Sequence, residues 1–523
     1  MNLLYFSLTL WLSRLSYAQD YQLVAHEYSA GASTQAAIKW DAPPHPDTTG
    51  NLIFDAAAHF LNHWSNAYRR NGHAVVPVTV SAGTLLYHGR DGLRADPNPP
   101  TGAEWLTLDM DHAMAYSAFQ GRVFSYAVER DLRLLYFDGA SATVLPTGTQ
   151  DVQDVIIYGN VSDFHRDAFL RLAQLCEWRD GYQIDGFFRM GFDFEMMLCN
   201  FTDGLRQLSD IDVVPCMLEH PPGWKGSIRD PNIMGYEFLA TGNWHNVEPI
   251  AGLHIDYSRM LSFYDRKYES LVRLRRGRKR LQRRLLNISD ADVQLLRGEL
   301  DDVLLRPSDD MGSGVQWGAI MQHVVESYAD RLEFLQHLLH SLDRRAMTGE
   351  EEGHDVPSLV ADVRQQVLTM LAPHISRTSV RGTDTDGLNH TWFEATIGRC
   401  SSKHTAHLPV ATFTPQEHTL KSAIDEAVHE ICRTLGIIWQ TAYTAESITS
   451  DVQHVTLVEE WAKEIDRLMA WLDWAEWQKC KPPCSEDESC SLPQWPFDGI
   501  ANGTEEAPPH CISKLHYRSQ NFR

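Results

Sequence analysis

Between about residues 72 and 205, apolar residues fall in short runs that are typical of β-strands. These runs are bounded by Gly, Pro or Asp and have the sequences HAVVPVTV, GTLLYHG, EWLTLD, RVFSYAVE and LRLLYFDG. The stretch GFFRMGFDFEMMLCNF, residues 186–201, also predicts strand. Two other segments, 51–71 and 166–178, repeat apolar residues on one helical face. This mixture predicts an α+β N-terminal domain, to which we assign residues 19–250.

The second half of the chain repeats apolar residues every three or four positions, which predicts amphipathic helices. The pattern begins after about residue 256 and recurs in long segments, separated by polar stretches such as MTGEEEGHDVP and RTSVRGTDTDG. Helices of this kind bury their apolar faces against one another. We therefore expect a mostly α-helical domain, an antiparallel bundle, over residues 251–479.

Cysteines are concentrated at the end of the chain. Four of the nine, Cys480, Cys484, Cys490 and Cys511, lie within the last 44 residues. In an exported protein this density predicts a short Cys-rich tail, residues 480–523, that is held together by disulfides. A zinc knuckle in CKPPCSEDESC is the alternative. The odd total leaves one thiol free or bonded to another molecule.

The first 18 residues, MNLLYFSLTLWLSRLSYA, have the pattern of a signal peptide. An apolar run precedes a small-x-small sequence at residues 16–18, and it is shorter than the roughly 20 apolar residues that cross a bilayer. Glycosylation sequons agree with export, at Asn160, Asn200, Asn287, Asn389 and Asn502. We expect a secreted, extracellular glycoprotein without a transmembrane segment in the mature chain; a membrane anchor is the alternative.

Charge is distributed unevenly along the chain. The formal net charge of −23 argues against nucleic acid as a partner. The segment RLRRGRKRLQRR, residues 273–284, is nevertheless strongly basic and carries Leu at roughly helical intervals. It predicts a solvated helix face that compensates nearby acids such as Glu299, Asp301 and Asp302. An acidic partner, a lipid headgroup and a processing site are the alternatives.

No metal is expected as a cofactor. The segment HEICR begins at His429 like a zinc-protease helix, but Arg433 stands where the second His is required. With 24 His in the chain, isolated His residues are weak indications of a site.

Residues 84–117 bring polar side chains to the ends of predicted elements. His88 and Gly89 end one strand, a second strand leads into a helix that carries Tyr116, and a later strand begins at Glu195. This order resembles the ADP-ribosyltransferase fold in its His-Tyr-Glu form, which poly-ADP-ribose polymerases and diphtheria-like toxins share. The resemblance covers about residues 80–205, roughly a quarter of the chain.

The resemblance implies that NAD is the substrate and gives each of these residues a role. Glu195 would hydrogen-bond the nicotinamide ribose and stabilise the oxocarbenium-like cation that forms as the glycosidic bond breaks. His88 would hold the adenosine ribose, Gly89 would admit the carboxamide against bare backbone, and Tyr116 would stack on nicotinamide. Asp109 is the expected N-cap of the helix, which places Tyr116 two turns into it.

Three features depart from the family pattern. Arg90 follows the His-Gly pair, whereas arginine-modifying relatives place an Arg within the first strand and use a Ser-Thr-Ser second motif that WLTLD does not match. The interval between Tyr116 and Glu195 is long and includes ATVLPTGTQDVQDVIIYGN. Asp193 lies two residues before Glu195 and is therefore expected on the same strand face. Arginine-modifying relatives carry a second acid there, usually Glu, so the shorter Asp leaves the choice of acceptor residue undecided.

Three functions follow as hypotheses. The first is a secreted NAD-consuming enzyme, either a mono-ADP-ribosyltransferase with an unknown protein acceptor or an NAD glycohydrolase. The second is a catalytically silent secreted glycoprotein with a binding or host-interaction role. The third is a structural helical glycoprotein in which the strand motifs only pack. If His88, Tyr116 and Glu195 line one cleft, the first two are favoured; if His88 and Glu195 lie on opposite faces, the third is favoured.

Overall fold

The computed structural model describes ten segments of the chain: residues 40–91, 98–117, 121–161, 167–212, 252–307, 309–341, 355–376, 391–444, 450–492 and 508–514. The expected signal peptide, Cys216 and the sequons at Asn389 and Asn502 lie outside the described residues. The chain divides into two units, Met1–Ala42 and Pro43–Arg523, and all the elements below belong to the second.

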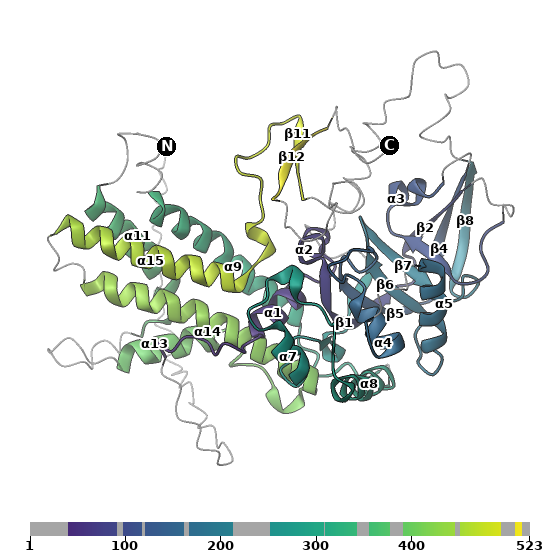
Figure 1. The fold of residues 1–523 in the computed structure, drawn as a ribbon, viewed down its shortest axis with the longest axis horizontal. Coiled ribbons are helices and arrows are strands. Elements are labelled where there is room, and N and C mark those ends of the chain that lie inside the picture. The colour runs from purple at the N-terminus through teal and green to yellow at the C-terminus, as the bar shows by residue number, and fades with distance from the viewer. Residues whose placement is uncertain are drawn as a thin grey trace, which may run out of the picture. The chain divides into compact units, whose positions relative to one another are not determined.

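A ten-stranded sheet dominates the first part of this unit (Figure 1). Its order is β10-β1-β5-β6-β7-β3-β2-β4-β8, with β9 paired to β1; within the sheet β5 and β6 are parallel and the other pairs are antiparallel. The strands are β1 Asn71–Val80, β2 Leu85–Arg90, β3 Glu104–Thr107, β4 Arg122–Val128, β5 Leu132–Gly139, β6 Gly186–Met190, β7 Phe194–Leu198, β8 Leu205–Asp212, β9 Leu253–Ile255 and β10 Leu261–Ser262.

Every strand run predicted from the sequence contains a strand of this sheet. The segment 186–201 forms two strands, because the three-residue turn 191–193 makes β6 and β7 a hairpin. The sequence pattern did not indicate β8, β9 or β10. Since β9 and β10 follow residue 250, the sheet contains chain on both sides of the boundary expected between the two domains.

Helices pack on both faces of the sheet. They are α1 Gly50–Ala58, α2 His63–Arg69, α3 Met110–Ala115, α4 Asp151–Tyr158 and α5 Ala168–Trp178. Strand residues such as Phe137, Phe187 and Met197 share one core with α4, α5 and a later helix, α8 (Asp290–Leu304). On the opposite face, the Tyr136 hydroxyl donates to Asn66 of α2 (2.9 Å). The single helix expected over 51–71 is two, α1 and α2, separated by residues 59–62.

The second part of the unit is mostly helical, as predicted. Its helices are α7 Glu269–Arg275, α8 Asp290–Leu304, α9 Trp317–Leu339, α11 Val356–Leu371, α13 Thr391–Ser402, α14 Pro415–Thr444 and α15 Asp451–Leu472, with short 3₁₀ turns at η2 Tyr257–Arg259, η3 Arg280–Gln282, η4 Ala372–His374, η5 Val410–Thr412 and η7 Ala475–Trp477. α9, α11, α14 and α15 lie side by side (Figure 1). Helix α1 also packs here, because Gly50 N donates to Glu426 of α14 (3.1 Å).

The basic block at 273–284 is not one solvated helix face, so that prediction is wrong. Helix α7 ends at Arg275, and Gly277 then adopts a positive φ of 69°, which breaks the helical run. From Arg276 onward, guanidinium groups of the block bind acids that are distant in the sequence: Arg276 pairs with Asp47, Arg280 with Asp473 and Arg284 with Asp151. The block therefore links the sheet part to the helical part.

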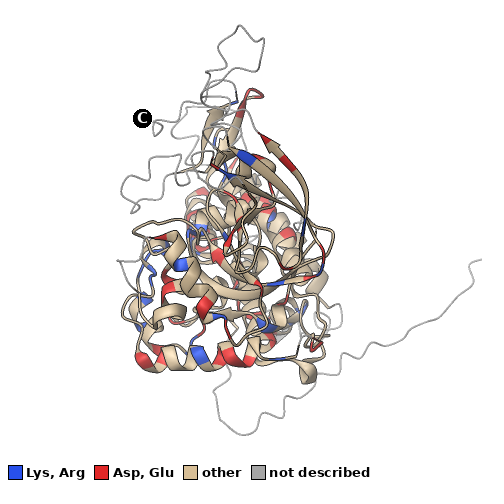
Figure 2. Ribbon diagram, turned by 90° about the vertical axis from the view of Figure 1, so that its right-hand side faces the viewer, with Lys and Arg blue, Asp and Glu red and all other residues tan. Residues whose placement is uncertain are grey.

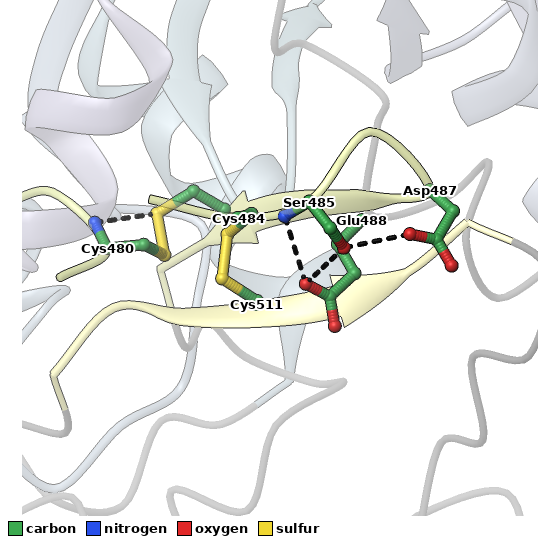
Figure 3. Close-up of a disulfide and its surroundings, with 7 residues drawn as sticks. Cys480, Cys484, Ser485, Asp487, Glu488 and Cys511 are labelled. Carbon is green, nitrogen blue, oxygen red and sulfur yellow. Dashed lines mark hydrogen bonds between the residues drawn. A yellow bond between two sulfur atoms is a disulfide. The ribbon is translucent and has the colours of Figure 1, made fainter. Parts of the chain in front are cut away.

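Eight cysteines are paired in the structure. The disulfides are Cys176–Cys199, Cys400–Cys432, Cys480–Cys490 and Cys484–Cys511. The last two close the tail around the strands β11 Glu488–Ser491 and β12 His510–Ser513 (Figure 3). Within the described part of the chain, no helix is both long and apolar enough to cross a bilayer. Figure 2 shows acidic and basic residues interspersed over strands and helices alike.

Candidate functional site

A cavity of about 470 Å³ lies where β2 and β3 diverge. β2 pairs with β4 along its whole length, but it pairs with β3 at a single pair of residues, Tyr87 and Thr107. Beyond the Tyr87–Thr107 pair both strands line the cavity, and α3, α5 and the turn 191–193 form other parts of its wall. Its volume is in the range of small-molecule sites.

The sheet register places a row of side chains on the cavity floor. Arg189 of β6 lies opposite Glu195 of β7, and Glu195 lies opposite Thr107 of β3, which in turn faces Tyr87 of β2. Directly opposed residues of antiparallel strands share a face of the sheet. All four of these residues line the cavity.

Glu195 is held by an ion pair at the cavity floor. The Arg189 Nε donates to Glu195 Oε1 (2.5 Å), and the two side chains are 4% and 12% exposed. Arg189 Nη1 also donates to Gln153 (3.4 Å), whose amide donates to the Ser141 carbonyl (2.6 Å). This chain of bonds fixes the direction of the carboxylate, and the guanidinium offsets part of its charge.

Tyr116 stands at the mouth of the same cavity. Asp109 caps α3 as predicted, accepting from Asp111 N, but the helix ends at Ala115, so Tyr116 is its C-cap and not an interior residue. The Tyr116 side chain is 52% exposed and its ring lies 6.3 Å from that of Phe192, at 21°. Partial burial raises the pKa of Tyr116, and the negative charge of the Glu195 carboxylate raises it further.

Gly89 is required by the packing of α3. A Cβ at this position would lie 1.7 Å from the Ala113 carbonyl oxygen and 3.2 Å from the Tyr116 Cβ. The missing side chain therefore lets α3 approach β2 and brings Tyr116 to the cavity. This close approach explains the glycine without a ligand, and contact with a carboxamide stays a prediction.

His88 borders the cavity from the gap between the two strands. Its Nδ1–H donates to the Trp105 carbonyl of β3 (2.8 Å). Its ring also packs 5.4 Å from that of Phe201 and 6.2 Å from that of Phe124. Strand alternation directs the His88 side chain away from the face that Tyr87 and Glu195 share. His88 and Glu195 therefore point to opposite faces of the sheet, which favours the third, structural hypothesis, although both residues contribute to the lining of one cavity, which favours the first two.

Asp193 is not a second acid in the cavity. β7 begins at Phe194, so Asp193 belongs to the turn, where the alternation of a strand does not apply. Its side chain is fully buried and lies 3.4 Å from His112 Nδ1, which also bonds the Thr107 hydroxyl (3.1 Å). Asp193 therefore supports α3 and the floor from below.

Among the residues that line the cavity, sequence reasoning missed Arg189, His112 and Phe192. Reading Gly191-Phe192-Asp193 as a hairpin turn would have placed Arg189 opposite Glu195. His112 follows Asp109 by three residues in α3, but nothing in the sequence shows that it bonds Asp193. Its ring lies 4.2 Å from that of Phe192.

Relatives of known sequence match this chain over different lengths. A family model described as the YPL277C N-terminal domain matches residues 117–232. The uncharacterized protein YOR389W of Saccharomyces cerevisiae is 22% identical over 93% of this chain and 89% of its own length. The uncharacterized protein YPL277C of the same organism is 24% identical over 49% of this chain and 71% of its own length. No solved structure matches.

The matched ranges include different parts of the candidate site. The range 117–232 contains Arg189 and Glu195, whereas His88, Gly89 and Tyr116 precede it. The similarity to YOR389W extends over most of the chain, so it includes sheet and helices together. Neither relative's description states an activity.

The charges around the cavity favour a cationic group. Three carboxylates, Asp91, Glu104 and Glu195, line it together with one guanidinium, Arg189. Aromatic rings from Trp105, Tyr116, Phe169 and Phe192 form much of the remaining wall. A flat, positively charged ring matches both features, because ring faces attract cations and stack on other rings.

Proposed function

We propose that this chain is an NAD-consuming enzyme, either a mono-ADP-ribosyltransferase or an NAD glycohydrolase, which acts in the cavity between β2 and β3. One observation carries the proposal. The residues chosen from the order of sequence motifs come from separate elements, yet they line the same cavity: His88, Gly89, Tyr116 and Glu195.

The chemistry needs a carboxylate beside a ribose. As the bond between the ribose C1′ and the nicotinamide nitrogen breaks, its electron pair leaves with nicotinamide and the ribose becomes an oxocarbenium-like cation. Glu195 would stabilise this cation, while Tyr116 and Phe192 would stack on the nicotinamide ring. Water or a protein side chain then attacks C1′ and gives up a proton. The acidic lining suits the nicotinamide ring, which is positively charged before cleavage.

The Arg189 pair favours a second candidate, a catalytically silent protein that binds a ligand in this cavity. A guanidinium 2.5 Å from Glu195 offsets the charge that would stabilise a ribose cation. The same contact could instead serve catalysis by holding the carboxylate in one orientation. Cleavage and binding must therefore be measured separately.

A secreted location is part of the proposal. The sequon residues Asn160, Asn200 and Asn287 are exposed, as attachment of a glycan requires. Paired cysteines also suit an oxidising compartment. The test is the mass of the chain secreted from a eukaryotic host before and after removal of N-glycans.

The activity is tested with NAD labelled on nicotinamide and on adenine. Release of nicotinamide with free ADP-ribose indicates glycohydrolysis, and adenine label on a protein indicates transfer. Binding without release favours the silent protein. If the folded chain shows neither binding nor release, both candidates are contradicted. Glu177→Gln on α5 is the matched control, because this exposed acid lies outside the cavity lining.

A further inference from the structure

We propose that the tail is a latent Zn²⁺ site, in which Cys480, Cys484, Cys490 and Cys511 bind the ion when their two disulfides are reduced. The Sγ atoms of Cys480, Cys484 and Cys511 lie within 4.8 Å of one another. The fourth sulfur, that of Cys490, lies next to this group because it is bonded to Cys480. The inference is independent of the NAD proposal.

The cluster is close to the geometry that zinc requires. With Zn–S bonds of about 2.3 Å, the sulfurs of a tetrahedral site lie roughly 3.8 Å apart. Cys490 and Cys511 are opposed in the β11–β12 ladder, yet each is bonded to a different cysteine. The two disulfides therefore lie side by side (Figure 3). After reduction, the two sulfurs of each disulfide must separate from about 2 Å to the tetrahedral spacing, whereas sulfurs of different disulfides must approach one another by about 1 Å or less.

The backbone around the sulfurs is held by bonds other than the disulfides. Cys480 N–H donates to Cys490 Sγ (3.0 Å), a contact that would stabilise a thiolate. Ser485 N donates to Glu488 (3.2 Å), and Lys514 N donates to the Asp487 carbonyl (2.9 Å). The turn between Cys484 and Cys490 thus has its own hydrogen bonds, which reduction leaves in place.

The tail also needs a cross-link of some kind. Among its described residues, Cys480, Ser491, Leu492 and Ile512 are buried, which is too small a set for an independent core. Small units of this kind are held by disulfides or by a metal. The redox state of the compartment then decides which of the two these cysteines provide.

The two states interconvert by a balanced reaction. Each disulfide takes two electrons and two protons from a dithiol reductant, which becomes a disulfide itself. The four thiols then bind Zn²⁺ as thiolates and release their protons.

The test is the zinc content of the full chain after reduction under anaerobic conditions, removal of the reductant and incubation with Zn²⁺. We expect about one Zn²⁺ per reduced chain and about a tenth of that or less for the oxidised chain. Cys484→Ser/Cys511→Ser should lose the ion, whereas the matched Cys400→Ser/Cys432→Ser should keep it. Equal zinc in the two double variants, or none in the reduced chain, would overturn the proposal.

A second measurement covers the case in which chemical reduction unfolds the chain. The protein is produced in the reducing cytoplasm of a bacterial host with Zn²⁺ in the medium, and its metal content is measured after purification. Zinc that is present in the wild-type chain and lost when the tail cysteines are replaced supports the site. Absence of zinc from the folded wild-type chain contradicts it. Co²⁺ in place of Zn²⁺ adds a visible absorption that reports tetrahedral thiolate ligation.

Discussion

The sheet part and the helical part each bury an Arg–Glu pair, and the two pairs differ in what surrounds them. Arg433 and Glu430 lie one turn apart on α14, with side chains 5% and 7% exposed. Arg189 and Glu195 lie on neighbouring strands, and both line the cavity. The helical pair is enclosed by packed helices, whereas the sheet pair faces space that a ligand can enter. This contrast indicates that a bound ligand can react at the sheet pair and not at the helical pair.

Burial of charged groups does not by itself distinguish the two regions. The helical part packs long apolar side chains, and its helices follow directly from their periodicity. Both parts also bury charged groups, among them Asp138 and Arg171 in the sheet part and Asp292 and Glu417 in the helical part. Burial of a charge is costly unless it is paired, so each such group marks a specific structural or functional need.

The largest effect is expected from Gly89→Ala in the sheet. The new Cβ would lie 1.7 Å from the Ala113 carbonyl, so α3 must move, at a cost of about 4 kcal/mol in the free energy of unfolding. The matched change in the helical part is Gly298→Ala in α8, where a Cβ meets no atom within 4 Å. It should stabilise the chain by about 0.5–1 kcal/mol. Denaturant titration checks both, and a similar effect of the two changes would contradict the packing role of Gly89.

The two buried pairs can be compared directly. Arg189→Met and Arg433→Met should each cost about 3 kcal/mol, because each leaves a buried carboxylate without its partner. Saturating NAD should recover part of the loss in Arg189→Met, since the cationic ring can approach Glu195 there. Saturating NAD should recover none of the stability that is lost in Arg433→Met. Thermal unfolding with and without NAD measures this, and equal recovery in both variants would remove the contrast between the pairs.

The junction between the regions should respond to pH through His59. Burial alone would lower the pKa of His59, but the Glu476 carboxylate and the hydrogen bonds to Asp55 and Glu476 raise it to about 10. A raised folded pKa means that this stabilisation is complete below pH 6.5, the ordinary His value, and is lost as pH rises toward about 10.

His59→Gln isolates the effect of that histidine. The wild-type chain should exceed it in stability by on the order of 2 kcal/mol at pH 6, and the difference should shrink toward pH 10. Denaturant titrations at a series of pH values provide the measurement. A difference that is constant with pH would show that His59 is not charged in the fold.

The smallest effect is expected from Tyr116→Ala. Its ring is half exposed, so the free energy of unfolding should change by less than about 0.5 kcal/mol. NAD binding should weaken by about tenfold, because stacking acts already in the bound ground state. Tyr116→Phe should bind NAD like the wild type. Loss of binding in the Phe variant as well would assign the role to the hydroxyl.

The sequence predicted the elements of the fold better than their contacts. Alternation and helical periodicity located β1 to β7 and the long helices, because each of these elements carries its own apolar pattern. β9 and β10 escaped notice, since strands of two or three residues contain too few positions for a pattern. The basic block was misinterpreted for a related reason: the acids that bind it lie far away in the sequence.

The same limit applies to the site. His88, Gly89, Tyr116 and Glu195 were chosen from the order of the sequence motifs, and all four line the cavity, while their roles toward NAD stay predictions. Arg189 was missed because its position opposite Glu195 depends on the register of a hairpin. Asp193 was misplaced because it lies in the turn before β7, which begins at Phe194, so the alternation of a strand does not apply to it. Register and turn geometry therefore decided what sequence patterns alone left open.

The central claim is that the Glu195 carboxylate performs NAD cleavage in this cavity. The most direct measurement is the rate of nicotinamide release at saturating NAD by the wild-type chain and by Glu195→Gln, with NAD affinity measured on both. We predict a rate at least about 100-fold lower for the variant, with affinity within roughly threefold, because the amide keeps the shape but loses the charge. Equal release by the two proteins would contradict this account.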